Sequence, residues 1–354
     1  MSIEQKMRAH ARFWRGEGPC LILIPTAAME PYDTDDYRER FKNPALMWAA
    51  EMRRTQPVPD WPTDGIPTVR PNLGVVFVPT IAGLGYTIQP GQMPWPGEPL
   101  SREQIRAGRQ REVSEAELVR YASEFYALHK AGGGNVAAYL PDTQGIFDVA
   151  HLLYGERIFY DLIDDPTWVS ELMEIALDLY TRVSLYLKGI LGESNHEMIH
   201  GHGTPQGVCF PHAGVRISED TPTLLSPKMI REFVIPFIER AATPFAGVFL
   251  HYCGYHKSLF EQLCQSPAVR AIDLGNSEMY DLRWLLERCA SSNTVFCSRI
   301  AAQPGEDWQP YVRRLGGLIR ETGARCILRP KVFPERRSEC ADMLQLWHEL
   351  TSDS

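Results

Sequence analysis

The residues best suited to chemistry lie in the stretch 247–254, GVFLHYCG, where His251 and Cys253 follow an apolar run. A short apolar run closed by a glycine is typical of a strand that is covered on both faces, as in a parallel sheet. Residues two positions apart on a strand share a face, so both side chains point the same way at the strand's C-terminal end. Neutral imidazole and thiolate are ligands that zinc prefers. The stretch therefore predicts a zinc site, although an accidental pair without metal has the same pattern.

A zinc site with one open position needs a third protein ligand, which must come from a neighbouring strand end. Asp273 is the best candidate, because it lies on the next predicted strand, 269–274. Glu278, just beyond that strand, and His202, on the strand before, are reserves. In the alternative reading, Asp273 pairs with Arg299 and the histidine–cysteine pair stays without metal.

The elements that must position these residues alternate between strand and helix. Eight segments are predicted to be strands: 20–24, 75–78, 135–140, 197–200, 247–252, 269–274, 294–298 and 326–329. Amphipathic helices are predicted mainly at 3–14, 114–130, 166–191, 228–240, 279–289, 308–321 and 338–350, with a kink at Pro236. This alternation in 354 residues predicts an α/β protein with a (β/α)8 TIM barrel. A doubly wound sheet is the second choice, because the chain lacks its G-x-G-x-x-G fingerprint.

The first third of the chain differs from the rest in its proline content. Ten of the 27 prolines lie between Pro57 and Pro99, which disfavours long helices there. We expect one barrel over residues 1–354, in which residues 1–110 form an N-terminal extension with a Pro-rich cap segment over the barrel mouth.

Many polar residues fall at or just beyond the predicted strand ends, where barrels of this type carry their chemistry. Asp142, Asp220 and Arg299 are the predicted catalytic residues. The predicted substrate-binding residues are Gln144, His202, Asn276, Glu278, Arg329 and Lys331. The cationic members suit a carboxylate or phosphate, but they are equally able to pair with acidic neighbours. Asp142 and Asp220 are also suited to capping helices.

Composition excludes several classes of function. The net charge is −8 and no basic stretch is interleaved with aromatic residues, which argues against nucleic acid or an anionic membrane as a partner. Residues 1–19 carry mixed charge, and no run of 18 apolar residues occurs, so we expect a cytoplasmic protein. The eight cysteines show no C-x-x-C pairing and are expected to be mostly reduced core thiols.

Three segments together resemble the uroporphyrinogen decarboxylase superfamily. They are ISED at 217–220, LSPKMIREFVIP at 225–236 and HYCG at 251–254, which are similar to the family's acidic strand end, its S-P-E-M-F-R-E-F-x-x-P helix and its H-x-C-G element. The matching region runs from about residue 134 to residue 334. The resemblance implies a (β/α)8 barrel in a family that includes corrinoid-dependent methyltransferases.

The resemblance is closer to the methyltransferase branch than to true uroporphyrinogen decarboxylases, whose Arg-rich opening motif is missing here. The H-x-C-G element is similar to the zinc site of methylcobamide:coenzyme M methyltransferases and of cobalamin-independent methionine synthase. This implies zinc, a small-molecule substrate, and a methyl group taken from a corrinoid on a partner protein or from a small methylated donor. The segment IDLGNSEM at 272–279 resembles the methionine synthase strand end that offers a glutamate to zinc.

One part of the chain departs from that pattern. Where those families carry P-x-C-G at the last strand end, this chain has RPKVF at 329–333, and Cys326 lies too early on the strand to replace the missing ligand. Two other hypotheses therefore remain. One is a metal-free decarboxylase or lyase of the same barrel, in which the cationic residues at 299, 329 and 331 bind a carboxylate and Asp142 or Asp220 relays a proton. The other is a non-catalytic protein that binds a corrinoid or tetrapyrrole.

Overall fold

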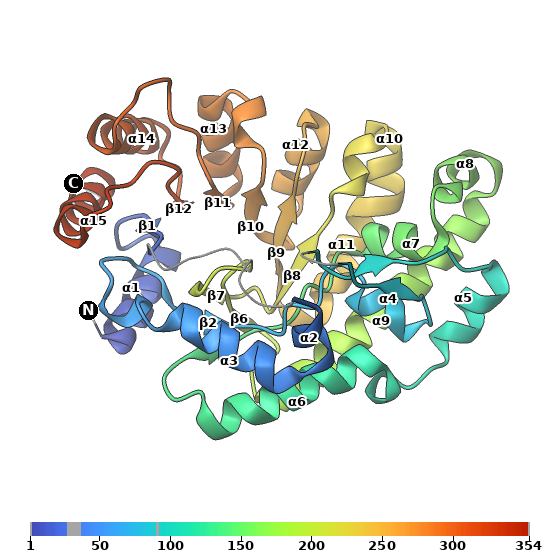
Figure 1. The fold of residues 1–354 in the computed structure, drawn as a ribbon. Coiled ribbons are helices and arrows are strands. Elements are labelled where there is room, and N and C mark those ends of the chain that lie inside the picture. The colour runs from blue at the N-terminus through green and yellow to red at the C-terminus, as the bar shows by residue number, and fades with distance from the viewer. Residues whose placement is uncertain (1, 27–36, 90–91, 353–354) are drawn as a thin grey trace.

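The central element is a parallel sheet of six strands (Figure 1). The computed structural model of the chain describes residues 2–26, 37–89 and 92–352. The sheet order is β1-β12-β11-β10-β9-β8. The strands are β1 Leu21–Ile22, β8 Val215–Ser218, β9 Val248–Tyr252, β10 Val269–Leu274, β11 Val295–Ser298 and β12 Cys326–Leu328. Every residue of β9 is buried, as the apolar run at 248–252 predicts.

A second sheet of four strands has the order β5-β2-β7-β6 and mixes parallel with antiparallel pairs. Its strands are β2 Ile66–Val69, β5 Ala137–Ala138, β6 Glu197–His200 and β7 Gln206–Pro211. A small antiparallel pair is formed by β3 Tyr86–Thr87 and β4 Trp95–Pro96. The α/β class is thus confirmed, whereas closure of eight parallel strands into one barrel is not.

Helices surround the sheets. In Figure 1, α12–α15 follow one another along the outside of β9–β12, and α6 and α9 lie on the opposite side of the molecule. The long helices are α1 Ile3–Trp14, α3 Pro44–Thr55, α6 Glu117–Gly132, α9 Pro166–Leu191, α13 Leu282–Ser292, α14 Trp308–Thr322 and α15 Arg337–Thr351. The shorter ones are α2 Tyr37–Lys42, α5 Arg102–Arg109, α7 Ile146–Tyr154, α8 Arg157–Asp164, α10 Pro227–Met229, α11 Ile235–Ala242 and α12 Lys257–Gln265.

The predicted strand at 75–78 is wrong. This region contains the start of a short helix, α4 Phe77–Ile81, whose apolar side chains are buried against α6, α7 and α9. An apolar run of four residues fits a buried helical turn as well as a buried strand, and periodicity cannot separate the two. The strand of this region is β2, which the sequence analysis did not identify. The cap over the mouth stays a prediction, and residues 90–91 of that segment lie outside the described residues.

The predicted kink at Pro236 takes the form of a π-helical turn, Ile230–Val234, between α10 and α11. Proline at the second position of α11 lacks the N–H that a continuous helix needs, which explains why the regular pattern breaks just before it.

One buried carboxylate joins β1, the segment leading into β2, and the C-terminal helix. Asp64 Oδ2 accepts hydrogen bonds from the backbone N–H of Ile22 at 2.8 Å and from His348 Nε2 of α15 at 3.0 Å. Asp64 is buried, so these hydrogen bonds connect elements inside the protein and are not a surface ion pair.

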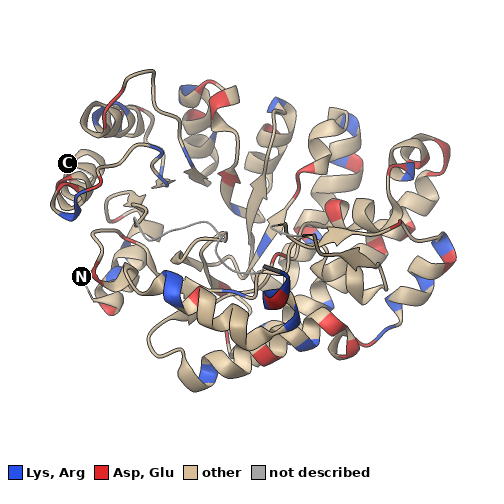
Figure 2. Cartoon of the chain, viewed as in Figure 1, with Lys and Arg blue, Asp and Glu red and all other residues tan. Residues whose placement is uncertain are grey.

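Acidic and basic residues both occur along the outer helices of the chain (Figure 2). This mixture agrees with the modest net charge of −8. Among the described residues, no helix combines the length and apolar character needed to span a bilayer.

Candidate functional site

The site forms where β9 and β10 end. Strand pairing places His251 beside Asp273, and both side chains are buried. His251 lies between two partners: its Nδ1 is 3.1 Å from Asp273 Oδ2, and its Nε2 is 3.4 Å from Cys253 Sγ. A carboxylate at Nδ1 favours the tautomer that carries the proton there. The lone pair of Nε2 is then directed toward the side of the ring where the Cys253 thiol lies.

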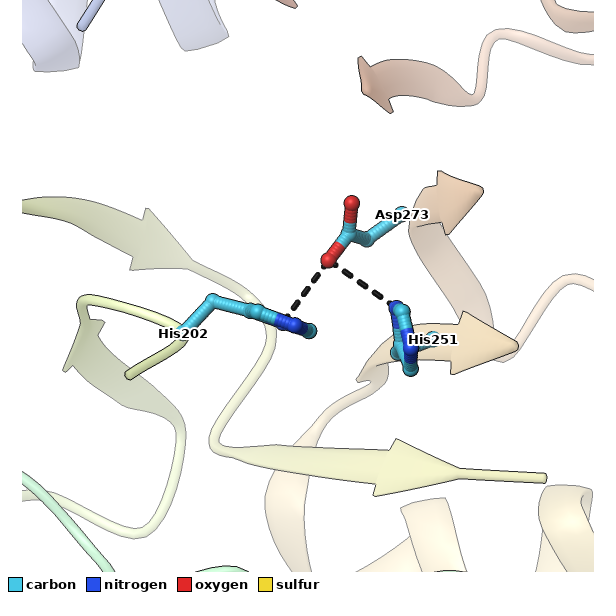
Figure 3. Close-up of side chains that lie close together, drawn as sticks. All are labelled: His202, His251 and Asp273. Carbon is cyan, nitrogen blue, oxygen red and sulfur yellow. Dashed lines mark hydrogen bonds and ion pairs between the residues drawn. The ribbon is translucent and has the colours of Figure 1, made fainter. Parts of the chain in front are cut away.

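Asp273 contacts two imidazoles (Figure 3) and also the guanidinium of Arg329. Its Oδ2 also lies 2.7 Å from Nδ1 of His202, and its Oδ1 binds Nη2 of Arg329. Burial alone would raise the pKa of Asp273, but Arg329 and the two histidines hold it well below its usual value. Asp273 is therefore an anion in a fixed position.

His202 reaches Asp273 from the turn between β6 and β7, so it belongs to the second sheet. Its backbone has φ 46°, a left-handed conformation that is uncommon for a residue with a side chain. Burial, opposed by the attraction of Asp273, lowers the pKa of His202 well below its usual value. The imidazole is thus neutral near pH 7 and able to act as a ligand or a hydrogen-bonding group.

Cys253 is held by a second carboxylate. Its backbone N–H donates to Oδ1 of Asp220 at 2.6 Å. Asp220 is itself positioned by Asp148 of α7, whose Oδ2 accepts from the Asp220 N–H at 2.9 Å. Burial, followed by the negative charge of Asp220, raises the pKa of the Cys253 thiol to about 11. A cation at this position would reverse that shift, because it stabilises the thiolate.

The described residues form two groups that could hold a metal ion, and both contain His251. Asp220, His251 and Cys253 form one group, and His202, His251 and Asp273 form the other, with ligand atoms within 4.8 Å of one another in each. Cys253 and Asp273 fall in different groups because they lie at opposite nitrogens of the imidazole. The predicted trio of His251, Cys253 and Asp273 therefore does not converge on one point.

One distance in the first group is compatible with a zinc ion. Zinc bound tetrahedrally to a nitrogen and a thiolate holds the two atoms about 3.6 Å apart, close to the 3.4 Å between His251 Nε2 and Cys253 Sγ. Imidazole, thiolate and carboxylate are all accepted zinc ligands. Asp273 fits better as the partner that orients His251, since zinc-binding histidines usually donate their other N–H to a carboxylate.

Arg299 and Lys331 extend the polar rim beyond β11 and β12. Both are exposed, and the side chain of neither makes a hydrogen bond or ion pair with another described residue. The alternative pairing of Arg299 with Asp273 is not found, because Arg329 takes that place. Cys326 is fully buried near Cys20 and belongs to neither of the two groups that could hold a metal ion.

Asp142 and Gln144 lie at the other sheet and interact with each other. Gln144 Nε2 donates to Asp142 Oδ1 at 2.9 Å, and Arg216 Nη1 donates to the same atom at 3.0 Å. Burial raises the pKa of Asp142, but Arg216 and Arg70 lower it more, so the carboxylate stays charged. A catalytic role for Asp142 stays a prediction; its pairing suits it to electrostatic positioning more than to proton transfer.

Asn276 and Glu278 support the turn after Cys253. Asn276 Oδ1 accepts from the N–H of Gly254 at 2.9 Å, and its Nδ2 donates to Glu278 Oε1 at 3.1 Å. Both contacts stabilise the backbone that presents the thiol. Binding of substrate by these two residues stays a prediction.

Two residues near the site, Arg216 and Asp148, were missed by sequence reasoning, and Glu219 was recognised only as part of the acidic strand end at 217–220. Glu219 is buried, and its carboxylate accepts from the N–H groups of Phe147 and Asp148 at the start of α7. Burial and the nearby charge of Asp220 raise the pKa of Asp148 to about 7. The alternating pattern V-R-I-S at 215–218 was the available signal, because it marks β8 and would have placed Arg216 on that strand.

Comparison with known proteins gives a structural match only. No protein-family model and no curated protein matches the sequence. A solved structure described as a methyltransferase from Methanosarcina mazei is similar in fold, with a TM-score of 0.60 and 14% sequence identity. The match covers 97% of this chain and 98% of that one. The likeness extends over the whole chain and establishes the fold, but not the family.

Proposed function

We propose that the protein is a zinc-dependent methyltransferase that moves a methyl group from a methylated corrinoid or a small methylated donor to a thiol-type acceptor. One observation carries the proposal: the 3.4 Å separation between His251 Nε2 and Cys253 Sγ, with the Asp220 carboxylate within reach of both. The fold likeness to the Methanosarcina mazei methyltransferase supports it.

In this proposal His251, Cys253 and Asp220 hold the metal, and one position is left for the acceptor. Bound zinc would lower the pKa of a thiol so that the thiolate is present at neutral pH. Asp273 holds the Nδ1 proton of His251 and so keeps Nε2 free for the metal. Arg329 keeps Asp273 anionic, and Asp148 fixes the backbone of Asp220.

The decisive measurement is the zinc content of the purified chain and its variants. We expect about one zinc per chain, lost in Cys253→Ala and strongly reduced in Asp220→Ala. Asp273→Ala should keep zinc but bind it about 10- to 100-fold more weakly, as expected for a residue that orients a ligand. Cys326→Ala serves as the control and should retain full zinc.

Complete loss of zinc in Asp273→Ala together with full retention in Asp220→Ala would return Asp273 to the ligand set. Retention of stoichiometric zinc in Cys253→Ala would remove the basis of the proposal. Activity is tested by the loss of methylcobalamin absorbance in the presence of a small thiol, with Cys253→Ala as the inactive control. A protein free of zinc would favour the metal-free lyase instead.

A further inference from the structure

A cavity of about 590 Å³ lies between α1, the segment 59–63 and the N-terminal half of α15. These elements lie at the β1 end of the six-stranded sheet (Figure 1). In the sheet order, β1 and β9 are four strand spacings apart, about 19 Å. The cavity shares no residue with either group that could hold a metal ion, and its volume is typical of a small-molecule site. It is therefore separate from the proposed metal site.

One buried charge lines this cavity. Lys6 is 2% exposed, and the single hydrogen bond of its Nζ within the described part of the chain goes to the carbonyl oxygen of Gly65 at 2.9 Å. Burial lowers the pKa of Lys6 to about 8, although Asp64 and Asp60 raise it, so the ammonium is still charged at pH 7. An ammonium has three donors, and two of them lack an acceptor here.

A second buried lysine shows how such a charge is satisfied elsewhere in the protein. The Nζ atom of Lys188 lies 2.5 Å from the carboxylate Oε2 of Glu193. It also donates to the carbonyl oxygens of Glu197 at 2.9 Å and Gly214 at 2.8 Å, so each of its three donors has an acceptor. Buried charges are normally paired in this way. The contrast indicates that the missing acceptor of Lys6 arrives through the cavity.

The other residues of the lining define the kind of ligand. Trp61 and Leu344 contribute apolar walls, and the indole Nε1 of Trp61 is buried without an acceptor among the described residues. Arg337 and Asp60 are exposed, and Nη2 of Arg337 donates to the carbonyl oxygen of Asp60 at 2.6 Å. The lining thus carries two cations, Lys6 and Arg337, and one carboxylate, which leaves one net positive charge. A monoanion with an apolar body would neutralise it.

We propose that this cavity binds a small carboxylic acid with an apolar body, whose carboxylate pairs with Lys6. The body of the ligand lies against Trp61 and Leu344, and the guanidinium of Arg337 adds a second positive charge. Hydrogen bonds between an ammonium and a carboxylate are charge-assisted and stronger than neutral ones. The site does not depend on the proposed methyl transfer, because none of its residues belongs to the metal site.

Isothermal titration calorimetry at pH 7 with benzoate and benzamide tests the site, because these probes have nearly the same shape and differ in charge. We expect benzoate to bind at one site per chain, about tenfold or more tightly than benzamide. Lys6→Met, which keeps the apolar stem, should abolish this preference. Ala341→Phe, which fills the cavity from α15, should prevent binding of both probes. Lys130→Met, at an exposed lysine of α6, is the matched control.

Two further measurements make the result specific to this cavity. Circular dichroism shows whether each variant is folded, and Ala341→Phe leaves the hydrogen bond of Lys6 untouched if Lys6→Met does not fold. Cys253→Ala should bind benzoate like the wild-type protein. Equal affinities for the two probes, no binding of benzoate, or a preference that survives in both cavity variants would overturn the proposal. A preference lost in Cys253→Ala and kept in Lys6→Met would move the acid to the proposed metal site.

Discussion

Arg329 and Asp273 form a buried ion pair at the site. Each side chain is at least nine-tenths buried, and the carboxylate also serves two imidazoles. Removing one partner leaves the other charge without compensation in a low-dielectric environment.

Arg329→Met should therefore reduce the free energy of unfolding by about 3 kcal/mol or more, measured by urea denaturation followed by circular dichroism. The double variant Arg329→Met/Asp273→Asn should recover part of this loss, because it removes both charges. Arg283→Met, which breaks a surface pair with Glu321, should change stability little. A single variant as stable as wild type would show that the pair is not formed in solution.

At the scale of elements, the contact between His348 of α15 and Asp64 should make the stability of the protein depend on pH. Burial lowers the pKa of His348, but the hydrogen bond and the negative charge of Asp64 raise it more, so the net shift is upward. A folded pKa above the unfolded value stabilises the protein below about pH 6.5, and this contribution is lost as the pH rises through the folded pKa.

His348→Gln should consequently lose about 1 kcal/mol of stability at pH 5.5 and less at pH 8.5. Thermal denaturation at the two pH values measures the difference. A loss that is independent of pH would mean that the histidine acts by packing alone.

The elements also show what sequence reasoning can and cannot reach. The pairing of His251 with Asp273 followed from the order of two apolar strands, and the long helices followed from their periodic stripes. The proposed role of Asp273 did not follow from the sequence. Whether Asp273 is a metal ligand or an orienting partner depends on which imidazole nitrogen of His251 its carboxylate contacts. β8 and its residue Arg216 were missed because an alternation over only four residues, 215–218, is a weak signal.

For the whole molecule, the contact between His202 and Asp273 joins the four-stranded sheet to the six-stranded one at the site. Local contacts open at a lower free energy than the core unfolds. In increasing urea, we expect amide hydrogen exchange in β6 and β7 to accelerate before the circular dichroism signal changes. Simultaneous transitions would indicate that the two sheets unfold as one unit.

The same contact has a consequence for how this protein can evolve. In many enzymes the active-site residues reduce the stability of the fold, and replacing them increases it. Here Asp273 contacts both the proposed ligand His251 and, through His202, the second sheet. Replacing Asp273 should therefore reduce both the activity and the stability of the fold. Selection for stability would then preserve the site as well. Substitutions of Asp273 that increase stability at the expense of activity should be rare.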